Sequence, residues 1–331
     1  MSSKQFNPKI ALVGSGQIGG MLALLAGLKK LSNNIVLLDV IDGVPQGKAL
    51  DTAQAFACEG LTCKTCGSAD LSASSEGLKD ADVVIVTAGF PRKPGMSRDE
   101  LLLKNASVIG NVGLAVKSQC PGAFVVCITN PLDAMVAKLQ ETSGLPAKRV
   151  VGMAGILDTS RFRTFLGEAL GVSPRDVHSM VLGGHGDAMV PLVECTSIAG
   201  IPLQKLIETN VISQSKVDEI VQRTRLGGGE IVDLLKTGSA FIAPASSALQ
   251  MVESYLRDEK RLLPCCAQMQ GEYGFKNLYG GVPVIIGKEG VEKIVQIPFS
   301  KNSTEEFNAS MKKCQDLMAE LKRIESEAQK N

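Results

Sequence analysis

The chain has 331 residues, more than a typical single domain of about 100 to 200 residues, which predicts two domains with a sizeable core. Hydrophobic residues make up 44% and charged residues 21%, proportions that argue against disorder. The formal net charge of +1 excludes an overall field that would attract nucleic acid or an anionic membrane. We therefore expect neither of these partners, and instead a small ligand held by a local cluster of charges.

The first 150 residues alternate short apolar runs with helix-like segments. We expect strands at residues 10–13, 35–39, 83–87 and 124–130, and helices at residues 18–30, 49–57 and 99–117. Unbroken apolar runs are typical of strands that are buried on both faces, and their alternation with helices indicates a parallel sheet. Residues 1–150 are therefore predicted to form an open α/β domain.

The pattern changes beyond residue 150. We expect a helix from residue 157, strands at 177–182, 282–286 and 291–296, and a glycine-rich segment at 183–187. Residues 151–331 are thus predicted to form a mixed α+β domain. The tail from residue 303 has one apolar helical face, which we expect to dock on the core rather than to form a coiled coil. This face consists of Phe307, Met311, Cys314, Met318 and Leu321.

Two further features concern the compartment. Little sequence precedes the first apolar run, and the longest apolar run ends well short of the ~20 residues that a bilayer requires, so we expect a cytoplasmic protein. The chain has nine cysteines, several in apolar stretches, which favours reduced buried thiols. The spacing of Cys63 and Cys66 leaves a zinc or redox site open, although no second pair or histidine lies nearby at suitable spacing.

The segment GSGQIG at residues 14–19 follows an expected strand and opens an expected helix. Asp39 ends the next strand, 20 residues after Gly19, which is the arrangement of a dinucleotide-binding, Rossmann-type fold. Gly14 and Gly16 let the main chain approach a pyrophosphate, and Gly19 lets helix and strand pack closely. The Asp39 carboxylate suits the ribose hydroxyls and would repel the extra phosphate of NADP, so we expect NAD. A methyltransferase-type or a glycosidase-type nucleotide fold stays open at this point.

The chain has only two histidines. His178 lies within an expected strand, where a structural histidine with satisfied hydrogen bonds is the simpler interpretation. His185 lies between glycines after that strand, where another molecule can approach, and imidazole is suited to proton exchange near neutral pH.

The helix expected from residue 157 would place Asp158 and Arg161 on one apolar stripe. Buried charges need partners, so these two either pair with each other or face a site. Asp158 could orient a protonated imidazole, and Arg161 could bind a carboxylate through two donors. Asp187 is a rival partner for His185, although it is poorly placed to reach the ring from two residues away.

Together these motifs resemble the lactate/malate dehydrogenase superfamily along essentially the whole chain, and most closely the malate dehydrogenases of its lactate-dehydrogenase-like group. The segments that carry the resemblance are GSGQIG (14–19), AGFPRKPGMSR (88–98), ITNP (128–131), LDTSR (157–161) and GGHGDAMVP (183–191). The resemblance implies an NAD-dependent enzyme that interconverts malate and oxaloacetate as a homotetramer or dimer.

The resemblance also implies a role for each matching residue. His185 would exchange the proton, Asp158 would be its partner, and Arg161 would anchor the C1 carboxylate of the substrate. Arg98 would polarise the reacting carbonyl, and Asn130 would bind near the nicotinamide ribose and the substrate. The full set of expected cofactor contacts is Gly14, Gly16, Gln17, Ile18, Gly19, Asp39, Thr87, Ala88, Gly89, Asn105 and Asn130. No metal site is expected.

The loop at residues 89–98 carries the expected substrate selectivity. In the family this loop closes over the substrate, and an arginine at the position of Arg92 pairs with the second carboxylate of malate, where lactate enzymes commonly have glutamine. Arg92 and the absence of the longer loop of apicomplexan lactate dehydrogenases therefore favour malate, whereas Lys93 is expected to be solvated. The alternatives are a lactate or other 2-hydroxyacid dehydrogenase, an NAD-dependent glycosidase and a non-catalytic NAD sensor.

Overall fold

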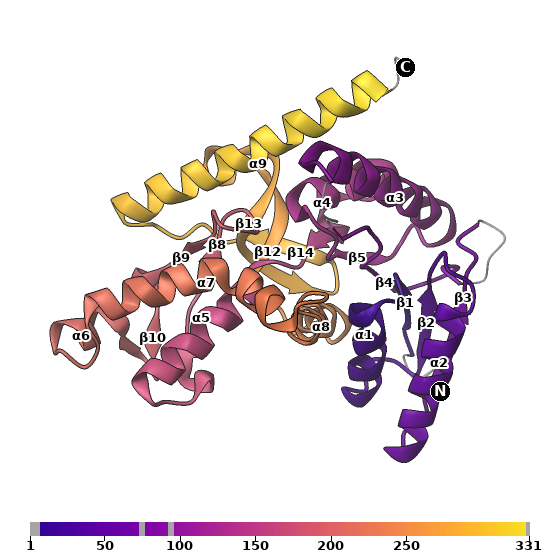
Figure 1. The fold of residues 1–331 in the computed structure, drawn as a ribbon, viewed down its shortest axis with the longest axis horizontal. Helices are drawn as coiled ribbons and strands as arrows, with labels where there is room; N and C mark the ends of the chain where they lie inside the picture. Colours follow the sequence, from indigo (N-terminus) through magenta and orange to yellow (C-terminus); the bar gives the residue numbers. More distant parts are fainter. Residues whose placement is uncertain (1–6, 73–76, 92–95, 329–331) are drawn as a thin grey trace.

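The computed structural model describes residues 7–72, 77–91 and 96–328, and within them one nine-stranded sheet organises the fold (Figure 1). Six of its strands are parallel, in the order β3-β2-β1-β4-β5-β6. These strands are β1 (Lys9–Val13), β2 (Asn34–Leu38), β3 (Lys64–Ser68), β4 (Val83–Val86), β5 (Phe124–Cys127) and β6 (Val150–Gly152). The order reverses between β1 and β4, the point at which open α/β sheets bind ligands.

The predicted parallel sheet is confirmed, and it is buried on both faces. Along β1, Ile10 and Leu12 belong to one apolar cluster, whereas Ala11 and Val13 belong to the other. Helices α1 (Gln17–Leu28), α2 (Val44–Cys58) and α8 (Ile242–Leu256) contribute to the first cluster; α3 (Arg98–Gln119) and α4 (Leu132–Ser143) contribute to the second. The sheet is therefore the middle layer between two helical layers (Figure 1).

The second half of the chain extends this sheet and adds smaller units, as expected of a mixed α+β domain. Strands β12 (Arg261–Gln270), β13 (Lys276–Gly287) and β14 (Gly290–Ile294) continue the sheet beyond β6 in antiparallel order. The remaining elements are α5 (Gly155–Leu170), α6 (Leu203–Glu208), α7 (Gln214–Leu235), β7 (Val177–His178), β8 (Val181–Leu182), β9 (Val190–Pro191), β10 (Ser197–Ile198), β11 (Ile201–Pro202) and the short 3-10 helices η1 (Ala147–Arg149), η2 (Pro174–Asp176), η3 (Val193–Cys195) and η4 (Glu272–Gly274).

Helix α9 (Lys301–Ala328) docks on the core, as predicted. Phe307, Met311 and Cys314 pack in one core cluster, and Leu321 packs in the other. Figure 1 shows this helix running across the molecule toward α3 and α4. Its apolar stripe therefore joins the C-terminal segment to both halves of the chain.

Some predicted boundaries differ from the structure. The strand expected at 177–182 is two short strands in different sheets, because Val177 pairs with Ile198 whereas Leu182 pairs with Val190. The expected helix at 49–57 already begins at Val44. The predicted domain division after residue 150 falls inside β6, and the division itself stays a prediction.

The described residues lack two features, a membrane-spanning helix and a cluster of metal ligands. No helix in residues 7–72, 77–91 and 96–328 combines the length and apolar character needed to span a bilayer. The same residues contain no group of three or more potential metal ligands among His, Cys, Asp and Glu side chains. All nine cysteines fall within these residues, and each is a free thiol.

Candidate active site

The glycine turn at residues 14–19 closes tightly at its ends and stays open in the middle. Gly14 has φ +105°, and a Cβ there would lie 2.4 Å from Thr87 Oγ1. A Cβ on Gly19 would lie 2.0 Å from the carbonyl oxygen of Gly14, so Gly19 lets helix and strand pack closely, as expected. At Gly16 a Cβ would have no described atom within 4 Å. The surface at Gly16 is therefore open to a ligand that approaches the main chain.

The start of α1 and the end of β2 frame this opening. Gly16 is the N-cap of α1 and supplies no side-chain cap, so the first amides of the helix are available to an anion. Gln17 is exposed and Ile18 is partly buried. Asp39 accepts hydrogen bonds from the amide of Ser15 at 2.7 Å and from its neighbour Val40 at 2.8 Å. These bonds hold the carboxylate beside the turn, where a ribose is expected.

The segment 87–89 is tied to both neighbouring strand ends. The Thr87 hydroxyl donates to the carbonyl of Gly14 at 3.0 Å, and the Thr129 hydroxyl donates to the carbonyl of Ala88 at 2.7 Å. A Cβ on Gly89 would lie 2.6 Å from the Thr129 methyl group, so close packing requires glycine here. The segment therefore lies at the carboxyl edge of the sheet, next to the glycine turn.

Asn105 is buried behind this segment. Its amide nitrogen donates to the carbonyl of Asn130 at 2.8 Å, and its amide oxygen accepts from the amide of Phe90 at 2.7 Å. The Asn105 side chain thus joins α3 to two loops, and its contact with the cofactor stays a prediction. Asn130 is exposed just after β5.

His185, Asp158 and Arg161 form one connected group. Asp158, from the first turn of α5, is only 2% exposed. One carboxylate oxygen lies 2.9 Å from His185 Nδ1, and the other lies 3.0 Å from Arg161 Nη1. The two alternatives left open for the Asp158 and Arg161 charges are therefore both realised, because they pair with each other and also reach the histidine.

Arg161 is held by α7 and keeps unused donors. Its Nε is buried without a hydrogen-bond partner among the described residues. A Cβ on Gly227 would lie 3.0 Å from Arg161 Cδ, and one on Gly228 would lie 3.5 Å from Arg161 Nη2. Glycines in α7 thus let the helix lie against the arginine. A largely buried guanidinium with a donor to spare is suited to binding a carboxylate.

The charges around His185 favour its protonated form. Burial alone would lower the pKa of His185, but the Asp158 carboxylate, with a smaller contribution from Asp133, outweighs burial and the repulsion from Arg161. The pKa of His185 therefore lies above its ordinary value. Because Asp158 binds Nδ1, the other ring nitrogen is left to exchange a proton with a substrate.

Other candidate residues lie elsewhere. Arg92 is outside the described residues. Arg98 is exposed at the start of α3 and has no hydrogen bond or ion pair within the described part of the chain. The Asp187 side chain is 84% exposed and approaches Lys313 at 3.9 Å, which removes it as the partner of His185. His178 lies in a strand, as expected, but is exposed and not packed in the core.

The sequence interpretation missed Asp133 in α4. This residue is 5% exposed, and its carboxylate accepts the main-chain amide of His185 at 3.1 Å. An acidic residue in the apolar segment LDAMVAKL, directly after ITNP, was the available signal. Burial raises the pKa of Asp133.

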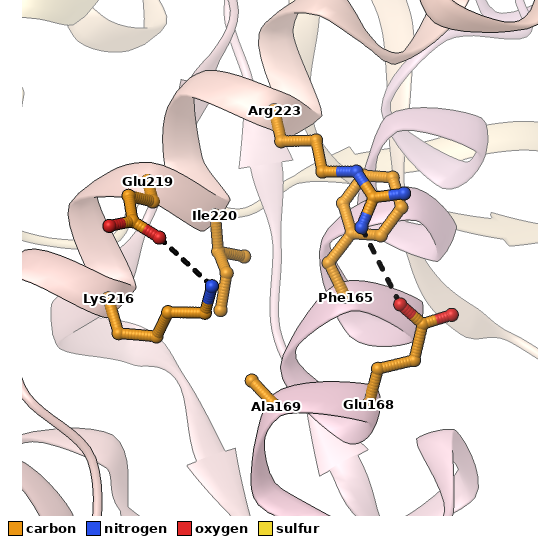
Figure 2. A pocket seen from close by; sticks show the side chains of 7 residues that line it. All are labelled: Phe165, Glu168, Ala169, Lys216, Glu219, Ile220 and Arg223. Atoms are coloured by element: carbon orange, nitrogen blue, oxygen red, sulfur yellow. Dashed lines mark hydrogen bonds and ion pairs between the residues drawn. The ribbon is translucent and has the colours of Figure 1, made fainter.

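A cavity of about 280 Å³ lies farther along the seam between α5 and α7 (Figure 2). Arg223 stacks over the Phe165 ring, with its guanidinium carbon 4.0 Å from the ring centroid, and approaches Glu168 at 3.6 Å. None of the candidate site residues lines this cavity. His185, Asp158 and Arg161 are instead gathered between the start of α5 and the loop at residues 183–187.

Two family models together match nearly the whole chain. Residues 8–152 match the family model of the lactate/malate dehydrogenase NAD binding domain, and residues 156–327 match that of the lactate/malate dehydrogenase alpha/beta C-terminal domain. The chain is 55% identical to a malate dehydrogenase of Methylobacterium radiotolerans, over 96% of this chain and 98% of that protein.

Solved structures of both enzyme types are also similar. Malate dehydrogenase from Cryptosporidium parvum has a TM-score of 0.92 at 48% identity, covering 96% of this chain and 100% of that one. The lactate dehydrogenase of the same organism, in complex with lactic acid and nicotinamide adenine dinucleotide, has a TM-score of 0.91 at 45% identity, covering 96% and 98%. The chain therefore belongs to the lactate/malate dehydrogenase family of NAD-dependent oxidoreductases.

Proposed function

We propose that the protein catalyses the reversible oxidation of (S)-malate to oxaloacetate with NAD. The observation that carries the proposal is the Asp158 carboxylate, which binds the His185 ring at 2.9 Å and the Arg161 guanidinium at 3.0 Å. A proton-transfer group and a carboxylate-binding group are thereby held side by side. The malate dehydrogenase of M. radiotolerans, 55% identical over nearly the whole chain, supports malate as the substrate.

Each side chain of the site has its own role in the proposed reaction. Arg161 binds the C1 carboxylate of the substrate, for which its buried Nε is a spare donor. His185 takes the hydroxyl proton of malate during oxidation, and Asp158 stabilises the resulting imidazolium. In the reduction of oxaloacetate, His185 returns this proton. Arg98 polarises the reacting carbonyl, and Asn130 contacts the substrate and the nicotinamide ribose.

The residues at the carboxyl edge of the sheet fit a dinucleotide. The open surface at Gly16 and the uncapped start of α1 suit a pyrophosphate, and Asp39, held beside the turn by the Ser15 amide, binds the adenosine ribose in this proposal. NAD, when bound, supplies the nicotinamide ring that accepts or returns the hydride. The cofactor cradle comprises Gly14, Gly16, Gln17, Ile18, Gly19, Asp39, Thr87, Ala88, Gly89, Asn105 and Asn130.

Arg92 selects the dicarboxylate in this proposal, by pairing with the second carboxylate of malate or oxaloacetate. The test is to follow NADH absorbance with oxaloacetate and with pyruvate, for the wild type and for Arg92→Gln. A site that loses such a partner discriminates by up to about 10⁴-fold, so Arg92→Gln should lower kcat/KM for oxaloacetate by ~10² to 10⁴. The activity on pyruvate should change far less.

Lys93→Gln is the matched control, because it removes the neighbouring loop cation, which is expected to be solvated. It should leave both activities within about twofold, since isolated solvated charges contribute little. Equal losses on both substrates in Arg92→Gln would refute Arg92 as the selector. A wild type that prefers pyruvate would instead assign lactate dehydrogenation, the reaction of the 45% identical C. parvum relative.

The proposal extends to the setting of the enzyme. The nine free cysteines suit the reducing cytoplasm, and malate and oxaloacetate suit a step of the tricarboxylic acid cycle. We expect a homotetramer, with a dimer as the alternative, and light scattering on the purified protein distinguishes the two masses.

A further inference from the structure

The main chain that carries His185 is held at three successive amides by three different elements. The amide of Gly183 donates to the carbonyl of Gly281 in β13 at 2.9 Å. The amide of Gly184 donates to the Ser310 hydroxyl in α9 at 2.9 Å. The amide of His185 donates to the Asp133 carboxylate in α4 at 3.1 Å. The main chain at His185 is thus held in place by contacts with β13, α9 and α4.

The two glycines before His185 permit this close anchoring. A Cβ on Gly183, where φ is +87°, would lie 2.6 Å from the Ser310 hydroxyl. A Cβ on Gly184 would lie 2.7 Å from the sulfur of Cys314. Side chains at either position would therefore push the loop off the surface that α4 and α9 present. The contact is a packed one, and not a chance approach of a mobile loop.

The Asp133 carboxyl is satisfied on its other side as well. Cys266, from β12, donates its thiol to Asp133 at 3.3 Å, and the Cys314 thiol, from α9, lowers the pKa of the same carboxyl. Ser310 is 1% exposed, so both anchoring side chains are buried next to the loop. Burying a carboxyl group is costly without such partners, which indicates a specific use for this one.

We propose that Asp133 and Ser310 are positioning residues for His185. They hold the backbone of the loop while Asp158 holds the ring, so that the free ring nitrogen stays directed at the substrate. The inference deepens the proposed dehydrogenase function and rests on it for its turnover readout. Through Ser310, it also makes the docking of α9 part of the catalytic geometry.

Asp133 carries a carboxyl group and Ser310 a neutral hydroxyl, so their substitutions should affect the pKa of His185 differently. The groups that face His185 are Asp158 and Arg161 of α5 and Asp133 of α4, with the thiols of Cys266 and Cys314 next to Asp133. Loss of either anchor lets the ring shift, and a 1 Å misplacement costs ~10²-fold in rate. Only the loss of Asp133 also removes a carboxyl group near the imidazole.

The experiment compares four variants by steady-state kinetics with oxaloacetate and NADH and by thermal unfolding. Asp133→Val removes the acceptor, Asp133→Asn keeps an acceptor oxygen without the charge, and Ser310→Ala removes the second anchor. Asp82→Asn is the matched control, because Asp82 also accepts a main-chain amide, that of Lys9 at 2.7 Å, but lies just before the first residue of β4, away from the site.

We expect Asp133→Val to lower kcat by ~10- to 100-fold and Ser310→Ala by ~10-fold, each with an unchanged KM for NADH. Asp133→Asn should recover part of the loss, and Asp82→Asn should keep the kcat of the wild type. Values of kcat within twofold of the wild type in both Asp133→Val and Ser310→Ala would overturn the proposal. If Asp133→Val does not fold, Ser310→Ala decides alone, by the same limit.

A second readout needs no substrate. Because the chain has only two histidines, NMR titration resolves His185 once His178→Gln has assigned the other ring. Asp133→Asn should lower the pKa of His185, and Ser310→Ala should leave it unchanged; an unmoved pKa in Asp133→Asn would overturn the role of its charge. A wild type that turns over no 2-oxo acid would refute the proposed function, and the titration would still test the anchor.

Discussion

The run of three glycines inside α7 leads to a prediction about substrate binding. Glycine in a helix interior costs about 1 kcal/mol relative to alanine, so three in succession need a reason. At Gly227 the reason is space, because a Cβ would lie 3.0 Å from Arg161 Cδ. At Gly229 a Cβ would meet no described atom within 4 Å. An alanine at Gly229 therefore tests only the helix propensity of glycine, whereas an alanine at Gly227 also tests the packing against Arg161.

Gly229→Ala should raise the free energy of unfolding by about 1 kcal/mol, or roughly 2 °C in Tm for a chain of this size. Gly227→Ala gains the same helix propensity, but contact at 3.0 Å compresses the stem of Arg161. The arginine must then shift by between a few tenths of an ångström and ~1 Å, which we expect to lower kcat/KM for oxaloacetate by ~10-fold, mainly through a higher KM.

The assay is NADH absorbance over a range of oxaloacetate concentrations, together with thermal unfolding of each variant. The KM for NADH should not change in either variant, because the contact concerns only the proposed carboxylate anchor. If Gly227→Ala binds oxaloacetate as tightly as Gly229→Ala does, α7 does not position Arg161 and the reasoning is refuted.

Three further predictions concern the catalytic group and the cofactor turn. Asp158→Asn should lower kcat/KM by ~10² to 10⁴ and lower the pKa of His185 in an NMR titration, and an unchanged pKa would contradict the pairing. Because the pKa of His185 is raised, kcat/KM for oxaloacetate reduction, which needs the protonated ring, should be level at low pH and fall as the pH rises through that pKa. Malate oxidation needs the neutral ring and should rise over the same interval, so pH profiles of the same sign would exclude His185 as the shared group. Gly19→Ala, whose Cβ would lie 2.0 Å from a carbonyl oxygen, should destabilise the fold by ~1 to 3 kcal/mol, whereas Gly16→Ala should preserve Tm but weaken NADH binding measured by fluorescence; unchanged NADH affinity in Gly16→Ala would remove Gly16 from the cradle.

The parallel sheet was predictable because its strands are short apolar runs between helical segments. Strand β3 (Lys64–Ser68) was not predicted, because it pairs only with β2 at the sheet edge and none of its residues is buried, so it has no apolar run. The prediction of one strand at residues 177–182 was wrong for a different reason. They look like one strand, but Val177 and Leu182 pair with different partners from distant parts of the chain. Local pattern identifies the buried strands but does not assign partners to short ones.

The proposed catalytic group was partly predictable for a similar reason. Asp158 and Arg161 stand out because charges on an apolar helical stripe need partners, and the glycines around His185 mark an accessible loop. Spacing alone could not tell whether Asp158 serves Arg161 or His185, and the structure shows that one carboxylate serves both. A shared carboxylate leaves no trace in sequence spacing, because its second partner comes from another element.

The loop that carries His185 shows why its anchors are the least predictable part of the site. A loop bounded by glycines has little stiffness of its own, yet proton transfer needs the ring held within a fraction of an ångström. Rigidity must therefore come from other elements, here α4, α9 and β13, which contact the loop from as far as 126 residues away along the chain. Asp133 follows the Asn130 segment on the cofactor side, and Ser310 lies on the C-terminal helix. The orientation of His185 therefore depends on both halves of the chain packing together, and damage to the α9 contact should lower catalysis before it lowers NADH binding.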